Sequence, residues 1–163
     1  MIPYRELFIE FERAELQYLV AGGFAVNFHQ VQRATVDLDL ILRLEPNNIR
    51  KFVSIMTTAG FKPRAPVDAV DLADEMKRQE WIKSKGMMVF SFFHSANPFE
   101  IVDVFIDEPK PFELLDQGKL VVEAFGVKIK VLGKKDLIEM KKSAGRDKDL
   151  FDISQLVKLD DEK

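Results

Sequence analysis

The sequence predicts an α/β (α+β) fold in which helices flank one mixed β-sheet. Segments with helical periodicity alternate with short apolar strands, and some strands also follow one another directly, so both parallel and antiparallel neighbours are expected. Apolar residues make up 47% of the 163 residues, which is enough for a substantial core. No linker, internal repeat or low-complexity stretch divides the chain. We therefore expect a single domain over residues 1–163, with C-terminal helices over about 134–159.

The elements of the first half follow from local periodicity and turn residues. Leu7, Phe8, Phe11 and Ala14 recur on one helical face, whereas the apolar run that begins at Leu16 is short and indicates a buried strand. The expected elements are a helix over 4–15, a strand over 16–21, a short helix over 24–30, a strand over 36–42 and a helix from about 46 to 59.

The second half begins with residues 61–67, which contain two prolines and are expected to form a loop. The charged stretch 68–84 is expected to be a single helix. Phe125 and Gly126 mark the turn of a hairpin, and Gly145 separates the last two helices. The remaining elements are expected over residues 87–93, 99–106, 112–117, 120–124, 127–132, 134–144 and 147–159.

Composition and charge exclude several classes of protein. The formal net charge is −3, whereas a dedicated binder of long nucleic acid is usually basic. The absence of cysteine excludes disulfides, thiolate metal sites and a cysteine nucleophile. The N-terminus is charged early, and no apolar run approaches the about 20 residues that span a bilayer. We expect a cytoplasmic protein without a membrane partner.

The first candidate site is the aspartate pair Asp37 and Asp39, in the second predicted strand. Residues i and i+2 of a strand point to the same face, so the two carboxylates are expected side by side. Two like charges this close repel each other unless a cation neutralises them, and Mg²⁺ prefers oxygen ligands. An isolated Asp-x-Asp pair is often only a solvated edge or turn, but the aliphatic neighbours Leu38, Ile41 and Leu42 indicate an interior strand.

Two glycines, Gly22 and Gly23, are expected at a strand-to-helix turn shortly before these aspartates. Because glycine has no Cβ atom, the backbone can approach a phosphate group closely, and the following helix offers free N–H groups. The alternative is a tight turn that only needs positive φ. The dinucleotide-binding fingerprint is absent, since no third glycine follows at the required spacing.

A third carboxylate is expected from a neighbouring strand, and Asp103 is the best candidate. It is flanked by aliphatic and aromatic residues on both sides, where a charged residue is rare unless it is paired or binds a metal. Glu100 and Asp107, nearer the ends of the same strand, are the alternatives.

Taken together, these residues resemble the nucleotidyltransferase superfamily of the polymerase-β type. The resemblance covers about residues 16–157 and is strongest for small single-domain bacterial members, the aminoglycoside and lincosamide nucleotidyltransferases and the transferases of abortive-infection and toxin–antitoxin systems. Many members have Gly-Ser where this chain has Gly22 and Gly23, and that serine contacts the triphosphate. The residues that carry the resemblance are Gly22, Gly23, Ala25, His29, Arg33, Thr35, Asp37, Asp39, the lone strand aspartate, and the segments 136–141 and 145–153.

The resemblance implies a nucleotidyltransferase-like fold and a two-metal displacement. Asp37 and Asp39 would hold two Mg²⁺ or Mn²⁺ ions, one of which arrives with the nucleoside triphosphate. Asp103 would bind the second metal and help to deprotonate the acceptor hydroxyl. Pyrophosphate would then leave from the α-phosphate.

Basic residues near the C-terminus are candidates for binding the nucleotide. Residues 128–148 carry eight lysine and arginine residues against three acidic residues. Lys148, in the matching Gly-Arg-Asp-Lys-Asp stretch, ranks first and Lys141 second, although solvated helix faces would give the same pattern. Arg33 is expected to bind either phosphate or an acidic neighbour, and Thr35 to order the turn into the strand and to lie with the nucleotide-binding residues.

The leading hypothesis is transfer of a nucleoside monophosphate from an NTP, such as ATP, to an acceptor hydroxyl. The alternative is a catalytically silent protein with the same fold, such as one half of a two-gene toxin–antitoxin type module. A metal-dependent phosphohydrolase ranks last, because it would use histidine ligands and only His29 and His94 exist. The acceptor is left open between a small molecule such as an antibiotic, an RNA end and a protein, and a homodimer or a small partner protein remains open. His29 and Trp81 are expected to be packing residues.

Overall fold

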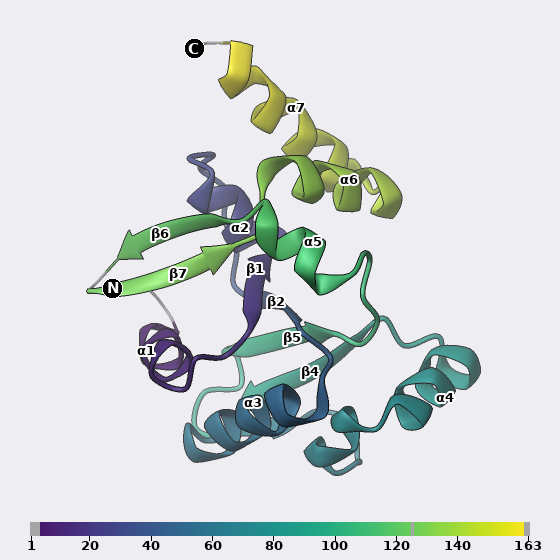
Figure 1. Ribbon diagram of the computed structural model, residues 1–163. Coiled ribbons are helices and arrows are strands. Elements are labelled where there is room, and N and C mark those ends of the chain that lie inside the picture. Colours follow the sequence, from purple (N-terminus) through teal and green to yellow (C-terminus); the bar gives the residue numbers. More distant parts are fainter. Residues whose placement is uncertain (1–3, 125, 162–163) are drawn as a thin grey trace.

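The computed structural model describes residues 4–124 and 126–161. In this part of the chain helices flank a single seven-stranded sheet, as Figure 1 shows. The strands are β1 (Tyr18–Ala21), β2 (Leu38–Leu42), β3 (Phe61–Pro63), β4 (Val89–His94), β5 (Ile101–Phe105), β6 (Leu120–Ala124) and β7 (Val127–Val131). The helices are α1 (Arg5–Arg13), α2 (Gly22–Phe28), α3 (Pro46–Thr58), the 3₁₀ helix η1 (Ala69–Ala73), α4 (Glu75–Lys85), α5 (Phe112–Gln117), α6 (Lys134–Ala144) and α7 (Asp147–Asp161).

The order of the strands across the sheet is β3-β4-β5-β2-β1-β7-β6. β2 runs parallel to β5 and β1 runs parallel to β7, whereas the other neighbours are antiparallel. The sheet is therefore mixed, and the predicted fold class is confirmed. The parallel β2–β5 pair joins two strands that lie far apart in the sequence, and this is the pair that carries candidate aspartates.

The central strands have one apolar face and one half-open face. Along β4 and β5 buried and half-buried residues alternate, so that Phe90, Phe92, Val102 and Val104 point into the core. Helix α3 covers this face, since Phe52 contacts Phe92 edge to face at 5.5 Å between ring centroids. The alternate residues of the same strands face the other way, where the polar side chains of the site lie.

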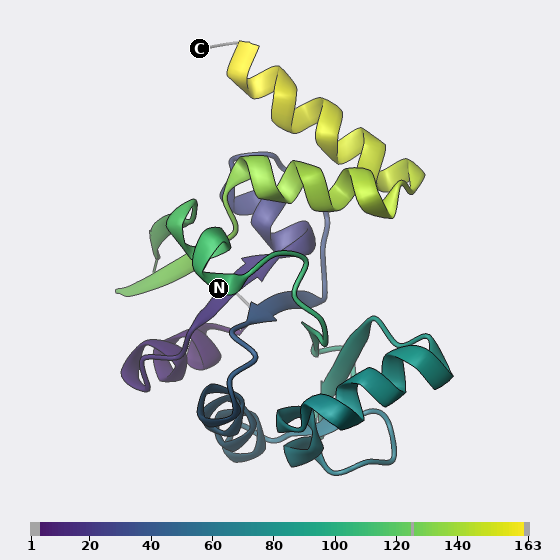
Figure 2. The same ribbon diagram turned by 45° about the vertical axis from the view of Figure 1, so that its right-hand side comes forward.

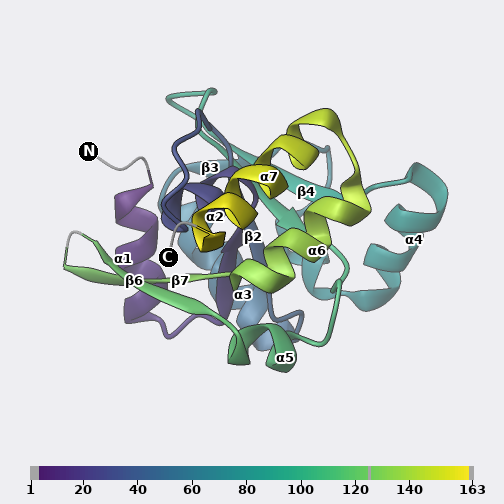
Figure 3. The same ribbon diagram turned by 90° about the horizontal axis from the view of Figure 1, so that it is seen from above.

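Helices α6 and α7 form an antiparallel hairpin that lies next to α2, beyond the ends of the central strands (Figures 1 and 2). Gly145, with φ of +65°, ends α6 in a left-handed conformation, as the sequence predicted for the break between the two helices. Seen from above in Figure 3, α7 crosses over α2 while α4 lies at the opposite side of the molecule. No helix of the described residues is long and apolar enough to cross a membrane.

Two predictions for the segment after α3 are wrong. Residues Phe61–Pro63 form the edge strand β3 rather than a loop, because an edge position needs only one side of the backbone for pairing and tolerates proline. The expected helix over 68–84 is divided into η1 and α4. The division follows from Asp74, whose carboxylate caps the backbone N–H groups of Met76 and Lys77 and so starts a new helix.

Two further differences concern the ends of strands. The expected strand over 36–42 begins only at Leu38, so Asp37 lies in the bend that precedes β2. The hairpin of β6 and β7 agrees with the prediction, but Phe125 of its turn lies outside the described residues. The predicted single domain over residues 1–163 also extends past them and stays a prediction.

Candidate active site

Three polar side chains form a row across the half-open face of the sheet. Asp39 of β2 is the direct partner of Asp103 in the parallel β2–β5 ladder. Ser91 of β4 lies opposite Asp103 in the antiparallel β4–β5 ladder, and its hydroxyl donates a 2.5 Å hydrogen bond to Asp103 Oδ1. Neighbouring strands of a sheet lie about 5 Å apart, so paired residues on one face are close neighbours. The register therefore brings two carboxylates together, 64 positions apart in the chain.

Asp37 completes the acidic group from outside the ladder. The expectation that it shares a strand face with Asp39 is wrong, since it lies in the bend before β2. Its charge nevertheless raises the pKa values of both Asp39 and Asp103, so it lies close enough to act on both. The three predicted carboxylates are thus neighbours, although only two of them are placed by strand geometry.

Burial and mutual repulsion raise the pKa values of two carboxylates in this acidic group. Burial is the main cause that raises the pKa of Asp39 to about 7, and the charges of Asp103 and Asp37 add to it. Burial also raises the pKa of Asp103, in part against the hydrogen bond from Ser91, which lowers it. Two carboxylates in mutual repulsion on one face give folding no advantage, but they provide hard oxygen donors for a cation.

The Gly22 turn lies directly beneath Asp39. Gly22 has φ of +61°, and a Cβ atom at this position would collide with the Asp39 carboxylate. A Cβ atom at Gly23 would lie 2.5 Å from Thr35 Oγ1 and 2.8 Å from Arg33 Nη1. Both glycines are therefore needed for close approach, and they bring the predicted nucleotide-binding residues Arg33 and Thr35 against the turn.

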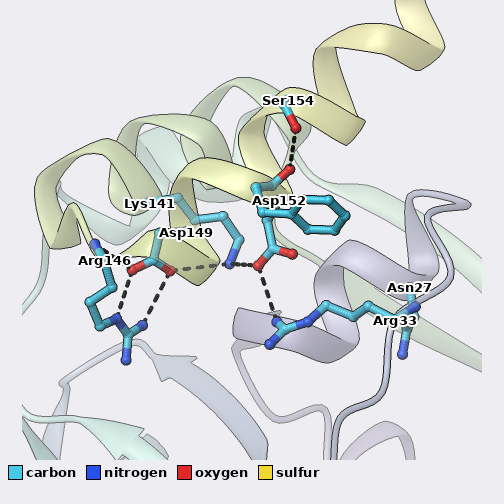
Figure 4. Close-up of polar contacts among 8 residues, drawn as sticks. Asn27, Arg33, Lys141, Arg146, Asp149, Asp152 and Ser154 are labelled. Atoms are coloured by element: carbon cyan, nitrogen blue, oxygen red, sulfur yellow. Dashed lines mark hydrogen bonds and ion pairs between the residues drawn. The ribbon is translucent and has the colours of Figure 1, made fainter.

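A network of charges around two buried carboxylates links this turn to the C-terminal helices (Figure 4). Lys141 Nζ lies 2.9 Å from Asp152 Oδ2 and 3.6 Å from Asp149 Oδ1. Arg33 Nη1 approaches Asp152 from the other side at 3.2 Å, and the Arg146 guanidinium binds both carboxylate oxygens of Asp149. Three cations against two carboxylates leave one net positive charge.

The ion pairs of this network determine which of the predicted basic residues remain available to bind a ligand. Lys141 is only 7% exposed in its side chain and is held by two carboxylates, so it acts within the protein. Lys148 is exposed and has no ion-pair partner among the described residues. The charges of both lysines lower the pKa of Asp39. Lys128 and Lys130, in contrast, belong to β7, and Lys130 lies over the Tyr18 ring instead.

Sequence reasoning missed several residues of the site. Ser91 interrupts the apolar alternation of β4, and this was the signal that could have placed it on the polar face. Arg64 follows β3, its backbone N–H donates to the Ser91 carbonyl, and its charge lowers the pKa of Asp103. Asp149 and Asp152 look like ordinary helix-surface residues in the sequence, and only the helix packing shows that they are buried.

The remaining candidate residues are His29, Trp81, Glu100 and Asp107. His29 Nε2 lies 2.8 Å from the Leu132 carbonyl oxygen, and burial lowers its pKa. Trp81 is buried against Phe90 in the core. Neither Glu100 nor Asp107, the alternatives to Asp103, takes the ladder position opposite Asp39.

The acidic group fits a metal ion only if a substrate supplies some of the ligands. Within the described ranges, no three aspartate, glutamate or histidine side chains converge closely enough to hold an ion as they stand. One carboxylate oxygen of Asp103 is engaged by Ser91. Mg²⁺, however, is usually held by one or two carboxylates, with phosphate and water oxygens completing its shell. The donor set fits an ion that arrives with a nucleotide.

Comparison with known proteins identifies the fold. No protein-family model and no curated protein sequence matches the chain. The lincosamide antibiotic adenylyltransferase LnuA, solved with lincomycin bound, matches with a TM-score of 0.62 at 16% identity over 95% of this chain and 96% of that one. ANT(2″)-Ia in complex with adenylyl-2″-tobramycin matches with a TM-score of 0.57 at 15% identity, over 92% and 83% of the two chains.

A fungal structure agrees with these two. An antigenic nucleotidyltransferase-like protein from Paracoccidioides brasiliensis matches with a TM-score of 0.60 at 13% identity, over 94% of this chain and 73% of that one. The similarity extends along almost the whole chain in each case, at sequence identities that establish the fold alone. The chain therefore has a nucleotidyltransferase-like fold of the polymerase-β type.

Proposed function

We propose that the protein is a metal-dependent nucleotidyltransferase. It transfers a nucleoside monophosphate from a nucleoside triphosphate to an acceptor hydroxyl and releases pyrophosphate. The observation that carries the proposal is the pairing of Asp39 with Asp103 on the half-open face of the sheet, directly above the Gly22 turn. A protein that only binds a partner through this fold has no physical need for two such carboxylates.

The reaction forms one bond and breaks another at the α-phosphorus. The acceptor oxygen attacks this phosphorus, and the bond to the bridging oxygen breaks so that pyrophosphate leaves with the electron pair. Asp103 accepts the hydroxyl proton. Asp37, Asp39 and Asp103 would hold Mg²⁺ or Mn²⁺, as two ions, and the metal when bound neutralises phosphate charge and activates the acceptor oxygen.

The cations around the site divide between the two substrates. The charge of Lys148 acts on Asp39, and the charge of Asp39 acts on Arg146. We assign both cations to the triphosphate, together with Thr35 and the Gly23 backbone. Arg64, whose charge acts on Asp103, is exposed and has no ion-pair partner among the described residues. We assign it to the acceptor.

A small molecule with a free hydroxyl is the acceptor we favour. The structures of LnuA and ANT(2″)-Ia were solved with lincomycin and with an adenylylated tobramycin, respectively. Their fold extends over nearly all of this chain. If the acceptor is instead an RNA end or a protein side chain, a labelling experiment would show the label on that molecule.

Calorimetry with ATP and GTP, in the presence and absence of Mg²⁺, tests the nucleotide part of the proposal. We expect binding that requires the metal and is lost in the Asp37→Asn/Asp39→Asn double variant. Asp107→Asn is the matched control, because Asp107 is an exposed carboxylate just beyond β5 and should bind as the unmodified protein does. Equal binding by the double variant and the control would refute the proposed site.

Labelling with cell extract tests the transfer itself. The protein is incubated with Mg²⁺ and α-³²P-labelled nucleotides in a small-molecule extract, and the labelled product is identified. We expect a labelled small molecule and free pyrophosphate. If the protein binds nucleotide in a metal-dependent manner but gives no labelled product, even with whole cell extract, the result would favour the catalytically silent alternative.

A further inference from the structure

We propose, resting on the function above, that Tyr4 is a positioning residue that fixes Asp37 relative to Asp103. Tyr4 immediately precedes α1, and its backbone has φ of +72°, which is unusual for a residue with a side chain. The residue is nevertheless only 8% exposed, and its ring packs edge to face on Phe24, with 5.8 Å between the ring centroids. This unusual backbone conformation accompanies the burial of the tyrosine ring in the core.

The Tyr4 hydroxyl joins the two segments that lead into the aspartate-bearing strands. Its Oη atom lies 2.7 Å from the Val36 carbonyl oxygen and 3.1 Å from that of Ile101, and it accepts a hydrogen bond from the Ile101 N–H at 3.2 Å. A hydroxyl has a single proton, so it donates to one carbonyl at a time, and the Val36 oxygen is nearer.

These contacts occur just before the regular ladder begins. The first paired residues of β2 and β5 are Leu38 and Val102, so the hydroxyl replaces a backbone pairing one step earlier. Val36 is bonded directly to Asp37, and residues 31–36 belong to no helix or strand. The hydrogen bond to Val36 therefore limits the motion of the peptide that carries Asp37, which no ladder holds.

The hydroxyl acts as a hydrogen-bonding group and not as a base. Burial raises the pKa of Tyr4 to about 12, and the neighbouring charges of Asp37, Glu100 and Asp103 also raise it. Tyr4 stays protonated at any pH at which the enzyme would work.

Tyr18 supplies a matched control for a buried tyrosine hydroxyl. It is 1% exposed, and its Oη accepts a hydrogen bond from the Lys130 N–H at 3.3 Å. It lies opposite Leu42, at the far end of β2 from Asp39. Tyr4→Phe and Tyr18→Phe each keep the ring and remove one buried hydroxyl, but only the first removes a contact beside the aspartates.

Both variants are made in the full-length chain, and calorimetry measures the affinity for ATP with Mn²⁺ and the Mn²⁺ concentration at half-saturation. We expect Tyr4→Phe to weaken MnATP binding about five- to tenfold and to raise the Mn²⁺ requirement, whereas Tyr18→Phe leaves both unchanged. The urea midpoints should fall by similar amounts in the two variants. Equal MnATP affinities in the two variants would overturn the proposal for Tyr4 while leaving the proposed function intact.

Amide hydrogen exchange in the unmodified protein keeps the proposal testable if Tyr4→Phe does not fold. The exchange of the Ile101 and Asp37 amides should slow together when MnATP is added. Unchanged exchange at both amides in a protein that binds MnATP would overturn the role of Tyr4. Absence of any MnATP binding by the unmodified protein would overturn both this inference and the proposed function.

Discussion

The Ser91 hydroxyl and the Asp103 carboxylate face each other across the β4–β5 ladder and share a 2.5 Å hydrogen bond. The bond fixes one carboxylate oxygen on the β4 side, which leaves the other free to face Asp39 and a substrate. Hydrogen bonds to a charged group contribute about 1.5–3 kcal/mol, enough to select one rotamer of a half-exposed side chain. Ser91 therefore orients the group that is proposed to accept the proton.

We expect Ser91→Ala to lower the rate of transfer about tenfold while leaving MgATP affinity within about twofold, because Asp103 loses its orientation but the phosphate contacts remain. Ser84→Ala is the control, since Ser84 also donates its hydroxyl proton to a single acceptor, the Glu80 carbonyl, on the exposed side of α4. Steady-state kinetics with labelled nucleotide separates the two parameters. A Ser91→Ala variant with unchanged turnover would show that the hydrogen bond has no catalytic consequence.

Replacing a site aspartate by asparagine should stabilise the protein when metal is absent. Asp39 is the more deeply buried carboxylate, and it is repelled by Asp103 and Asp37. We expect Asp39→Asn to raise the free energy of unfolding by roughly 1–3 kcal/mol at pH 8 with EDTA present, and to abolish transfer. Asp103→Asn should give a smaller gain, since the hydrogen bond from Ser91 already stabilises the charged form of Asp103.

The gain at Asp39 should depend on pH in a definite direction. A carboxyl group whose pKa is raised to about 7 in the folded protein keeps its proton there after the unfolded chain has released it, so the folded state loses stability between the unfolded and the folded pKa. The two proteins should therefore be equally stable near pH 4 and diverge as the pH rises to about 7, with no further change above it. Asp161→Asn, at the exposed end of α7, should show no such divergence. Unfolding of Asp39→Asn at pH 8 would instead assign Asp39 a structural ion pair.

Lys141 and Lys148 should separate into one structural and one ligand-binding residue. Lys141→Met leaves Asp149 and Asp152 buried with less compensation, so we expect a loss of about 3 kcal/mol in the free energy of unfolding. Lys148→Met should change stability by less than about 0.5 kcal/mol, because the side chain is exposed and makes no ion pair in the described part of the chain. Urea unfolding measures both.

Charge reversal at Lys148 tests the contact with the triphosphate. Lys148→Glu should weaken MgATP binding about tenfold and reduce the dependence of the affinity on salt, since one charge contact is lost. Lys83→Glu, on the exposed surface of α4, is the control and should have neither effect. Matching affinities and salt dependences in the two variants would show that Lys148 belongs to a solvated face.

The sequence was sufficient for the fold class and for which strands carry the aspartates, because both depend on local patterns. Alternation along β5 singled out Asp103, and the Gly22–Gly23 pair marked the turn correctly. Edge strand β3 and the break at Asp74 were missed, since an edge pairing and a side-chain cap depend on contacts that periodicity does not report. Local propensity predicts the elements, whereas packing decides their ends.

The charges of the site were less predictable than its carboxylates. Lys141, Lys148 and Arg146 are equally basic in the sequence, and only the packing of α6 on α7 buries the first of them between two aspartates. The position of Asp37 was misjudged for a similar reason. Its Asp-x-Asp spacing predicts a shared strand face, but the chain enters the ladder one residue later, at the point where the Tyr4 hydroxyl holds Val36.

Gly23 lies close against the Thr35 side chain. Many proteins that the sequence resembles have serine at the position of Gly23, where its hydroxyl contacts the triphosphate. In this chain a Cβ atom at residue 23 would lie 2.5 Å from Thr35 Oγ1 and 2.9 Å from Thr35 Cβ. The threonine hydroxyl therefore occupies the space that a serine side chain would need, and we expect it to make the same phosphate contact.

Three variants distinguish the effect of the Thr35 hydroxyl on nucleotide binding from the effect of the space that the Thr35 side chain occupies. Thr35→Ala should weaken MgATP binding about three- to tenfold with little change in stability. Gly23→Ser alone should lower the free energy of unfolding by roughly 1–3 kcal/mol, because Thr35 cannot move aside as the flexible end of Arg33 can. The double variant Gly23→Ser/Thr35→Ala removes the clash and restores one hydroxyl, so it should recover both stability and affinity.

Gly22→Ser is the control that Thr35→Ala should not rescue, since the positive φ of Gly22 and the Asp39 carboxylate oppose any side chain there. Additive effects of the two substitutions on MgATP affinity and on urea unfolding would show that Thr35 does not take the place of the serine.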